Sequence, residues 1–373
     1  MEMRNIDKLG VSTSLLGFGC MRFPTLENGE IDRELSVKML DMAFERGVNY
    51  YDTAYPYHNG ESELFLGEYL NGKERESYFL ATKLPVWQID CVEDARKMFE
   101  TQLSRLQKDY IDFYLLHAMD RERFEKMRDL GVIDFCEELK AQGRIRFLGF
   151  SFHDDYEVFE EMINYKDWDF CQIQYNYMDV NEQAGDKGYK LTVEKNVPLV
   201  IMEPVKGGSL ANLPEEIRDI LGTPDNSTAS FALRFVASRP NVKVVLSGMS
   251  TMEQVEDNLN TFSNFTPLSE EEEQNIVKVR EALNNRVRNG CTGCNYCMPC
   301  PKGVDIPKNF RIWNKYNVYG NLDELRNNVR NIKNDGKWAE ACVGCGLCET
   351  KCPQRILIRD NLKTLVKEIN NVL

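Results

Sequence analysis

The chain has 373 residues, of which 42% are hydrophobic and 28% charged, and its formal net charge is −13. This composition is too apolar for a disordered protein, and the length allows two or three domains. No run approaches the roughly 18 apolar residues of a membrane span, and the acidic balance argues against nucleic-acid binding. The first residues lack the apolar core of a secretion signal. We therefore expect a cytoplasmic protein with neither a membrane nor a nucleic-acid partner.

Charge and cysteines are unevenly distributed along the chain. Residues 287–373 hold 14 Lys and Arg against 8 Asp and Glu, a balance of +6, whereas residues 1–286 hold 32 against 51, a balance of −19. Eight of the twelve cysteines lie from Cys291 onward. The sequence therefore predicts a large acidic domain over residues 1–286 and a small, basic, cysteine-rich domain over residues 287–373.

Short apolar runs alternate with longer amphipathic segments in the first domain, which is typical of a parallel sheet with crossover helices. The expected strands are residues 14–21, 49–54, 78–83, 111–117, 145–151, 170–176, 198–204 and 242–248. Expected helices include residues 34–46, 92–106, 124–141, 227–238 and 251–262, the last capped by Ser250. Eight such units fit a (β/α)8 TIM barrel. A doubly wound sheet is the alternative, but its glycine-rich fingerprint is missing after the first strand.

Polar residues stand where consecutive strands should end: Asp52, Lys83, His117, Ser151 and Gln174. Burying a lone charge is costly, so an Asp52–Lys83 ion pair with a buried core histidine is the structural explanation of these residues. Barrel enzymes, however, place their chemistry at the carboxyl ends of the strands. The full set at consecutive strand ends favours a catalytic site.

Three segments carry a family resemblance. Residues 47–63 (GVNYYDTAYPYHNGESE), 79–83 (FLATK) and 114–117 (YLLH) resemble the signature of the aldo/keto reductase family, and the similarity extends over residues 9–262. The resemblance implies a barrel enzyme that reduces a small-molecule carbonyl, with Tyr57 as general acid, Lys83 and Asp52 tuning it, and His117 orienting the carbonyl. A free tyrosine has a pKa of about 10, which a neighbouring ammonium lowers. Tyr55 is the rival acid in this loop, and only the resemblance favours Tyr57.

The resemblance also implies a nicotinamide dinucleotide, NAD(P)H, and barrels often bind phosphate in the loops after strands seven and eight. Three positions depart from the family pattern: Phe152 replaces a carboxamide, Met202 an aromatic residue, and Gln254 an arginine that binds the 2′-phosphate. We therefore expect little preference for NADPH over NADH, and a flavin is an alternative. The expected cofactor-binding residues are Ser151, Gln174, Pro204, Lys206, Gly207, Gly208, Leu210, Gly248, Ser250, Gln254 and Asn258.

The second domain contains two cysteine runs, each followed by proline. The second run matches the spacing of bacterial ferredoxins, and the first departs from it by one residue in its last gap. Eight thiolates can hold two [4Fe–4S] clusters, while four-cysteine zinc sites are the alternative. In two-cluster ferredoxins the fourth cysteine of each run binds the other cluster. Carried over, one cluster takes Cys291, Cys294, Cys297 and Cys352, and the other takes Cys300, Cys342, Cys345 and Cys348.

The spacer between the runs includes the helical-looking residues 321–332, which resembles helical dicluster ferredoxins. Our first hypothesis is an oxidoreductase that reduces a carbonyl or related substrate at Tyr57, with electrons relayed by the two clusters and a one-electron redox protein as partner. A second is a redox-sensing, nucleotide-binding barrel with little turnover. A third is an ordinary NAD(P)H reductase, or a flavin-dependent version, whose clusters are structural.

Overall fold

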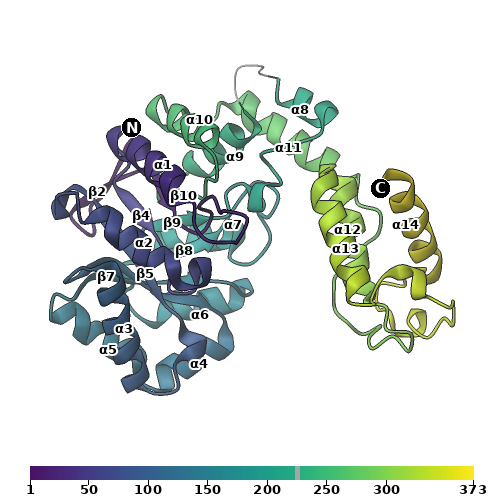
Figure 1. Ribbon diagram of the computed structural model, residues 1–373, viewed down its shortest axis with the longest axis horizontal. Coiled ribbons are helices and arrows are strands. Elements are labelled where there is room, and N and C mark those ends of the chain that lie inside the picture. The colour runs from purple at the N-terminus through teal and green to yellow at the C-terminus, as the bar shows by residue number, and fades with distance from the viewer. Residues whose placement is uncertain (223–226) are drawn as a thin grey trace. The chain divides into compact units, whose positions relative to one another are not determined.

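The computed structural model describes residues 1–222 and 227–373. It divides into two compact units, one of residues 1–207 and 229–269 and the other of residues 208–228 and 270–373 (Figure 1). Helix α11 (Glu270–Asn284) therefore belongs to the second unit. The domain boundary expected at residues 286 and 287 stays a prediction.

In the described part of the first unit, eight parallel strands close into a barrel in the order β10-β3-β4-β5-β6-β7-β8-β9. The barrel closes where Val245 of the last strand pairs with Leu16 of the first. The predicted TIM barrel is confirmed, and each strand falls inside or within two residues of its expected range. The strands are β3 (Leu16–Gly19), β4 (Tyr50–Asp52), β5 (Phe79–Leu84), β6 (Ile111–Met119), β7 (Ile145–Phe152), β8 (Phe170–Gln174), β9 (Leu199–Met202) and β10 (Val242–Ser247).

A hairpin that the sequence analysis did not predict precedes the barrel. Its antiparallel strands are β1 (Met3–Ile6) and β2 (Val11–Ser14). Ile6 joins the apolar cluster inside the barrel, which also contains Phe113 and Phe147. The hairpin therefore adds to the core at the end of the barrel away from the strands' carboxyl ends.

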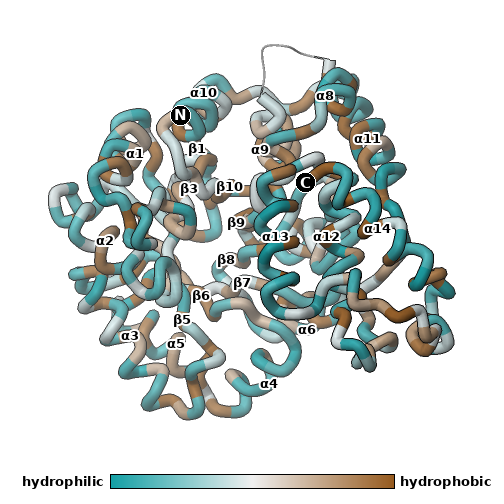
Figure 2. Tube along the Cα trace, turned by 45° about the vertical axis from the view of Figure 1, so that its right-hand side comes forward, coloured by the Kyte–Doolittle hydropathy of each residue, from teal (hydrophilic) through white to brown (hydrophobic). Residues whose placement is uncertain are grey.

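Helices surround the sheet, with hydrophobic and hydrophilic residues alternating along them (Figure 2). The expected helix over residues 124–141 is two helices in the structure, because Gly131 adopts a left-handed φ of 73° between them. Thr251, rather than Ser250, caps α10: its side chain accepts a hydrogen bond from the Gln254 amide. The helices are α1 (Arg33–Glu45), α2 (Glu61–Leu70), α3 (Val92–Leu106), α4 (Arg121–Asp129), α5 (Val132–Ala141), α6 (Tyr156–Tyr165), α7 (Gly185–Glu194), α9 (Thr228–Ala237) and α10 (Met252–Ser263).

The second unit is helical in its described residues, as predicted. Besides α11 it contains α8 (Glu215–Leu221), α12 (Ile306–Tyr319), α13 (Leu322–Asn334) and α14 (Ile358–Val372). Its core holds Trp313, Leu325 and Leu365, and six of the eight clustered cysteines pack against that core. The helices therefore form a scaffold for the cysteine-bearing loops. No helix among the described residues is both long and apolar enough to span a bilayer.

Candidate active site and cysteine cavities

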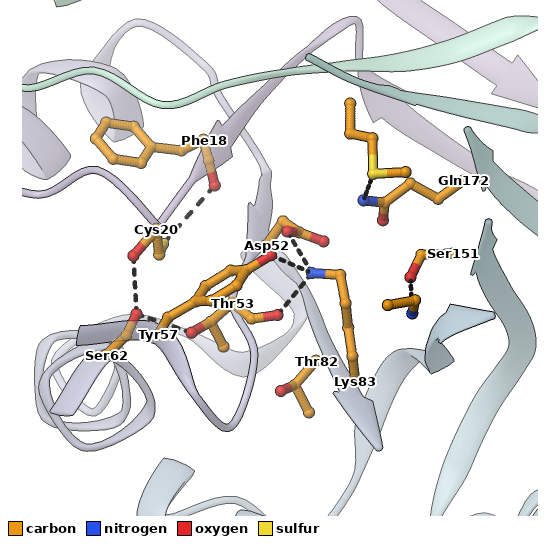
Figure 3. A network of polar contacts seen from close by, with 12 residues as sticks. Phe18, Cys20, Asp52, Thr53, Tyr57, Ser62, Thr82, Lys83, Ser151 and Gln172 are labelled. Carbon is orange, nitrogen blue, oxygen red and sulfur yellow. Dashed lines mark hydrogen bonds and ion pairs between the residues drawn. The ribbon is translucent and has the colours of Figure 1, made fainter. Parts of the chain in front are cut away.

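Four predicted site residues come together near the carboxyl ends of the strands. Asp52 is the last residue of β4, and Tyr57 begins the 3-10 turn that follows it. Lys83 lies on β5 and His117 on β6. The Lys83 ammonium donates hydrogen bonds to Asp52 Oδ1 at 2.6 Å and to the Thr53 carbonyl at 2.8 Å, and its Nζ lies 3.5 Å from Tyr57 Oη. Figure 3 shows the three oxygens around one nitrogen.

The local sequence holds Tyr57 in this place. His58, Asn59 and Gly60 have φ values of 51°, 56° and 96°, and asparagine and glycine adopt the left-handed region at low cost. Ser62 then ties the loop to the barrel: its hydroxyl lies 2.8 Å from the Thr53 hydroxyl and donates to the Cys20 carbonyl at 2.9 Å. The turn therefore returns the phenol toward the strand ends.

The pKa shifts fix the protonation states of Lys83 and Tyr57. Burial would lower the pKa of Lys83, but the Asp52 carboxylate and the Tyr57 oxygen hold it above the usual 10.5. Burial raises the pKa of Tyr57 above 10.0, and the Lys83 ammonium opposes this only in part. The expected lowering by Lys83 is thus present but outweighed by burial of the ring. At neutral pH the lysine is a cation and the phenol carries its proton.

His117 is neutral beside the phenol. Burial holds its pKa well below 6.5, and the Lys83 ammonium acts in the same direction. The imidazole stands edge-on to the Tyr57 ring, with centroids 6.0 Å apart, and its centroid is 5.1 Å from that of Trp87. Its Nδ1 is buried and lacks a hydrogen-bond partner among the residues that the structure describes. A neutral imidazole here can make a hydrogen bond to a bound substrate.

The structure distinguishes the two candidate tyrosines. The guanidinium of Arg105 lies over the Tyr55 ring, 4.0 Å from its centroid. Within the described residues, the Tyr57 hydroxyl is hydrogen-bonded to Lys83 and that of Tyr55 is not. The geometry therefore favours Tyr57 as the proton donor.

A buried polar network supports the strand that carries Lys83. Gln102 donates to the Lys83 backbone carbonyl at 3.0 Å and to Glu63 Oε1 at 2.8 Å, and Thr82 donates to the same Glu63 oxygen at 2.7 Å. Glu63 and Gln102 are fully buried. These contacts hold the lysine backbone from the helix side of the sheet.

Gln172 is a candidate site residue that the sequence analysis missed. It lies in the middle of β8 and is 2% exposed, and its Oε1 lacks a hydrogen-bond partner in the described part of the chain. Gln174, which we expected to bind the cofactor, instead donates to Asp179 at 2.9 Å and accepts from Gln183 at 2.9 Å. Figure 3 places Gln172 and Ser151 on the far side of Lys83 from Tyr57. The sequence did contain a signal for Gln172, because it is a polar residue in the middle of a strand that is otherwise apolar around it.

In the loop after β9, which we expected to bind phosphate, the lysine side chain forms an ion pair within the protein. Lys206 Nζ contacts both carboxylate oxygens of Asp179, at 2.5 and 2.6 Å. Lys206, Gly207 and Gly208 have φ values of 51°, 62° and 93°, a left-handed stretch that the glycines permit. Pro204 is buried in the first unit, and Gly208 and Leu210 fall in the second. A phosphate role for this loop stays a prediction.

The loop after β10 is fastened to its neighbours. Ser250 donates through its hydroxyl to the Arg22 carbonyl at 2.7 Å, and its amide donates to Gln254 Oε1 at 2.8 Å. Asn258 donates to the Ser247 hydroxyl at 2.7 Å. A Cβ atom at position 248 would lie 2.7 Å from Cγ of the Arg22 side chain, so any residue other than glycine there would require the Arg22 side chain to shift. Gln254 and Asn258 thus order this loop, and binding of a dinucleotide to them stays a prediction.

The eight clustered cysteines line two cavities in the second unit, and each cavity draws on both runs. One, here called the neutral cavity, is lined by Cys291, Cys294, Cys297 and Cys352. The other, here called the basic cavity, is lined by Cys300, Cys342, Cys345 and Cys348, with Cys297 also in its wall. This grouping matches the two ligand sets expected from crossed ligation. Eight soft sulfur ligands around two cavities fit a pair of [4Fe–4S] clusters.

Comparisons with known proteins agree with both parts. The model of the aldo/keto reductase family matches residues 15–281, and that of the 4Fe-4S dicluster domain matches residues 290–357. An uncharacterized oxidoreductase, YqkF, of Bacillus subtilis is 28% identical over 73% of this chain and 94% of its own. The NADH-specific methylglyoxal reductase of Escherichia coli is 25% identical over 68% of this chain and 89% of its own.

Solved structures resemble the barrel. The holo form of the aldo-keto reductase AKR11C1 from Bacillus halodurans superposes with a TM-score of 0.64 at 29% identity, covering 75% of this chain and 96% of its own. An aldo/keto reductase from Klebsiella pneumoniae in complex with NADP and acetate has a TM-score of 0.61 at 20% identity, over 73% and 93% of the two chains, and shares the fold. The family model covers well over half of the sequence, and the chain therefore belongs to the aldo/keto reductase family, as an oxidoreductase that also carries a 4Fe-4S dicluster domain.

Proposed function

We propose that the barrel reduces the carbonyl group of a small molecule with hydride from NAD(P)H, and that two [4Fe–4S] clusters in the second unit relay electrons. One observation carries the catalytic part: a single buried ammonium, Lys83, contacts Asp52 and lies 3.5 Å from the hydroxyl of Tyr57. When bound, the nicotinamide supplies a hydride and the clusters supply one-electron carriers. The chain's own residues supply the proton, the orientation and the charge balance.

The proton comes from the Tyr57 hydroxyl. Adding hydride to a carbonyl carbon leaves negative charge on the oxygen, which needs a positioned donor. Tyr57 holds its proton at neutral pH because burial raises its pKa. Once the proton has moved to the substrate oxygen, the phenolate lies beside the Lys83 ammonium, which stabilises it. The products are the alcohol and the oxidised dinucleotide.

Asp52 and His117 assist this proton transfer in different ways. Asp52 keeps Lys83 charged and pointed at the phenol, since a lone buried ammonium would lose its proton. His117 stays neutral and has a ring nitrogen available. It can therefore orient the carbonyl without adding a second positive charge beside Lys83.

Gln172 supports a nicotinamide on the other side of the barrel mouth, whereas the Ser151 hydroxyl already accepts a hydrogen bond from the Ala118 amide at 2.7 Å. The unpartnered Oε1 of Gln172 is a buried acceptor, and a carboxamide N–H is the kind of group that satisfies it. The names of relatives add support: one is an NADH-specific reductase, and two Klebsiella structures contain NADP or NADPH. Gln172 thus replaces Gln174 as our candidate for the carboxamide contact.

Electron counting leaves a flavin as the second candidate cofactor. A hydride carries two electrons at once, whereas each cluster exchanges one, and flavins can do both. Phe152 and Met202 stand where the family pattern has a carboxamide and an aromatic residue, and Met202 contacts Gln172 in the described structure.

The proposal is tested on anaerobically purified protein with NADH or NADPH and methylglyoxal as the carbonyl probe. We expect Tyr57→Phe to lower kcat by about 10²–10⁴-fold, with nucleotide binding unchanged by fluorescence titration. The matched variant Tyr55→Phe should keep wild-type kcat. Equal losses in both variants, or a wild-type kcat in Tyr57→Phe, would refute Tyr57 as the acid. Flavin released on denaturation would replace the nicotinamide assignment.

A further inference from the structure

The two cysteine cavities differ in charge. Three basic side chains line the basic cavity, those of Lys302, Lys351 and Arg359, and its lining contains no acidic residue. Apart from its cysteines, the neutral cavity has no ionisable side chain in its lining, and its polar side chains are Thr292, Asn295 and Gln354. Of the two expected cluster sites, only one therefore has basic side chains in its lining.

The two lysines of the basic cavity are available for interaction. Arg359 is paired with Glu349, with nitrogen–oxygen distances of 2.8 and 2.9 Å. Lys302 and Lys351 are exposed, and neither has an ion-pair partner among the described residues. Neither lysine is paired with a carboxylate among the described residues, so each can bind an acidic group on a protein that approaches this face.

Apolar side chains accompany these lysines. Val343 and Leu347 line the same cavity, next to its cysteines, and are 62% and 55% exposed. Exposed aliphatic side chains gathered in one place and flanked by charge are typical of a protein-binding surface.

We propose that Val343, Leu347, Lys302 and Lys351 form a docking face for an acidic one-electron carrier protein, which exchanges electrons with the cluster held by Cys300, Cys342, Cys345 and Cys348. This rests on the clusters of the proposed function. One electron leaves the reduced carrier and enters the cluster, so the carrier is oxidised by one electron and the cluster is reduced by one. No bond or proton changes hands.

Charge complementarity selects the occupant. Unpaired lysines attract a negatively charged partner and raise its rate of encounter at low ionic strength. Val343 and Leu347 add a small apolar contact from which water is excluded in the transient complex. A weak electron-transfer encounter needs only a small interface.

The test is stopped-flow reduction of the anaerobic full-length protein by a reduced acidic [2Fe–2S] ferredoxin, followed by cluster absorbance at low and high salt. The variant is Lys302→Gln/Lys351→Gln. The matched control is Lys363→Gln/Lys367→Gln, which removes the same charge from exposed positions on α14 outside both cavities. We expect the second-order rate constant at low salt to fall at least tenfold in the variant, with a flattened salt dependence, and to change little in the control.

A second variant separates contact from charge. Val343→Ser/Leu347→Ser should slow reduction by the ferredoxin and keep its salt dependence, while reduction by dithionite stays at the wild-type rate. Equal rates in all variants, or equal losses in variant and control, would refute the docking face. Protein with about eight irons and unchanged rates refutes this face alone, whereas protein without iron refutes the cluster proposal as well.

Discussion

The barrel site and the basic cavity use positive charge in opposite ways. The Lys83 side chain is fully buried and the Asp52 carboxylate beside it is 4% exposed, so each ion has lost its water and depends on the other. Lys302 and Lys351 keep their water and have no ion-pair partner in the described residues. A buried charge must be paired to exist at all, and it then sets the properties of one neighbouring group. An exposed, unpaired charge costs little and acts on molecules that arrive from outside.

Replacing Lys83 tests the buried side of this comparison most severely. Lys83→Met leaves the Asp52 carboxylate buried and unpaired, so the free energy of unfolding should fall by about 3–5 kcal/mol. Activity should fall by about 10²-fold or more, since the phenolate loses its ammonium. Chemical denaturation and steady-state kinetics measure the two effects.

The control for this prediction removes both charges. Asp52→Asn/Lys83→Met should recover much of the stability and none of the activity. If the single variant is as stable as the wild type, the pair is not a structural necessity, and the contrast with the exposed lysines loses its basis.

Cys352→Ser tests how the two cavities share ligands. Cys352 belongs to the second run but lines the neutral cavity with Cys291, Cys294 and Cys297. The iron content should fall from about eight to about four per chain. The remaining signal should belong to the basic cavity, and a further Cys345→Ser substitution should remove it. Cys91→Ser, an exposed cysteine outside both cavities, is the control. Loss of the basic-cavity cluster instead would mean that each run holds its own cluster.

The choice of nucleotide should be weak. Gln254 stands where the family pattern has an arginine, and its side chain already accepts a hydrogen bond from the Ser250 amide. A charged hydrogen bond to a 2′-phosphate contributes about 1.5–3 kcal/mol, and Gln254 cannot supply it. The ratio of kcat/KM for NADPH over NADH should therefore stay below about tenfold. A hundredfold ratio would show that another cation has taken this role.

The smallest expected effect concerns pH. His117 is buried and its folded-state pKa lies well below 6.5, so its contribution to stability is present above pH 6.5 and is lost as the pH falls through the range below. Below pH 6.5 the unfolding free energy should fall by up to about 1.4 kcal/mol per pH unit more steeply in the wild type than in His117→Asn. If the unfolding free energies of the wild type and of His117→Asn fall in parallel below pH 6.5, the imidazole takes up its proton in the folded protein as readily as in the unfolded chain.

The barrel could be predicted because its signal is local and repeated eight times. Each apolar run of the alternation became a strand, and the resemblance of the two cysteine runs to those of two-cluster ferredoxins implied the ligand sets that the cavities bring together. The hairpin of β1 and β2 escaped prediction because two strands of four residues lie outside that repeat. The expected helix over residues 124–141 is divided at Gly131, and the neighbouring residues do not indicate that this glycine adopts a left-handed conformation.

The cofactor side could be predicted only in outline, because its contacts join residues far apart in the chain. Lys206 pairs with Asp179, 27 residues away, a contact that the local sequence does not indicate. Gln172 and Gln174 are chemically identical and two residues apart, and only the packing of β8 shows which one keeps an unsatisfied oxygen. Burial likewise decided the pKa of Tyr57, against the direction that its neighbour alone suggested.

Cys297 lies in the lining of both cysteine cavities, so the two cavities share one wall. Ile306 lines both cavities as well, and an electron added in one cavity would repel an electron arriving in the other across this shared wall. Uptake of the second electron is then harder than uptake of the first. The unit would then fill with electrons in two separate potential steps.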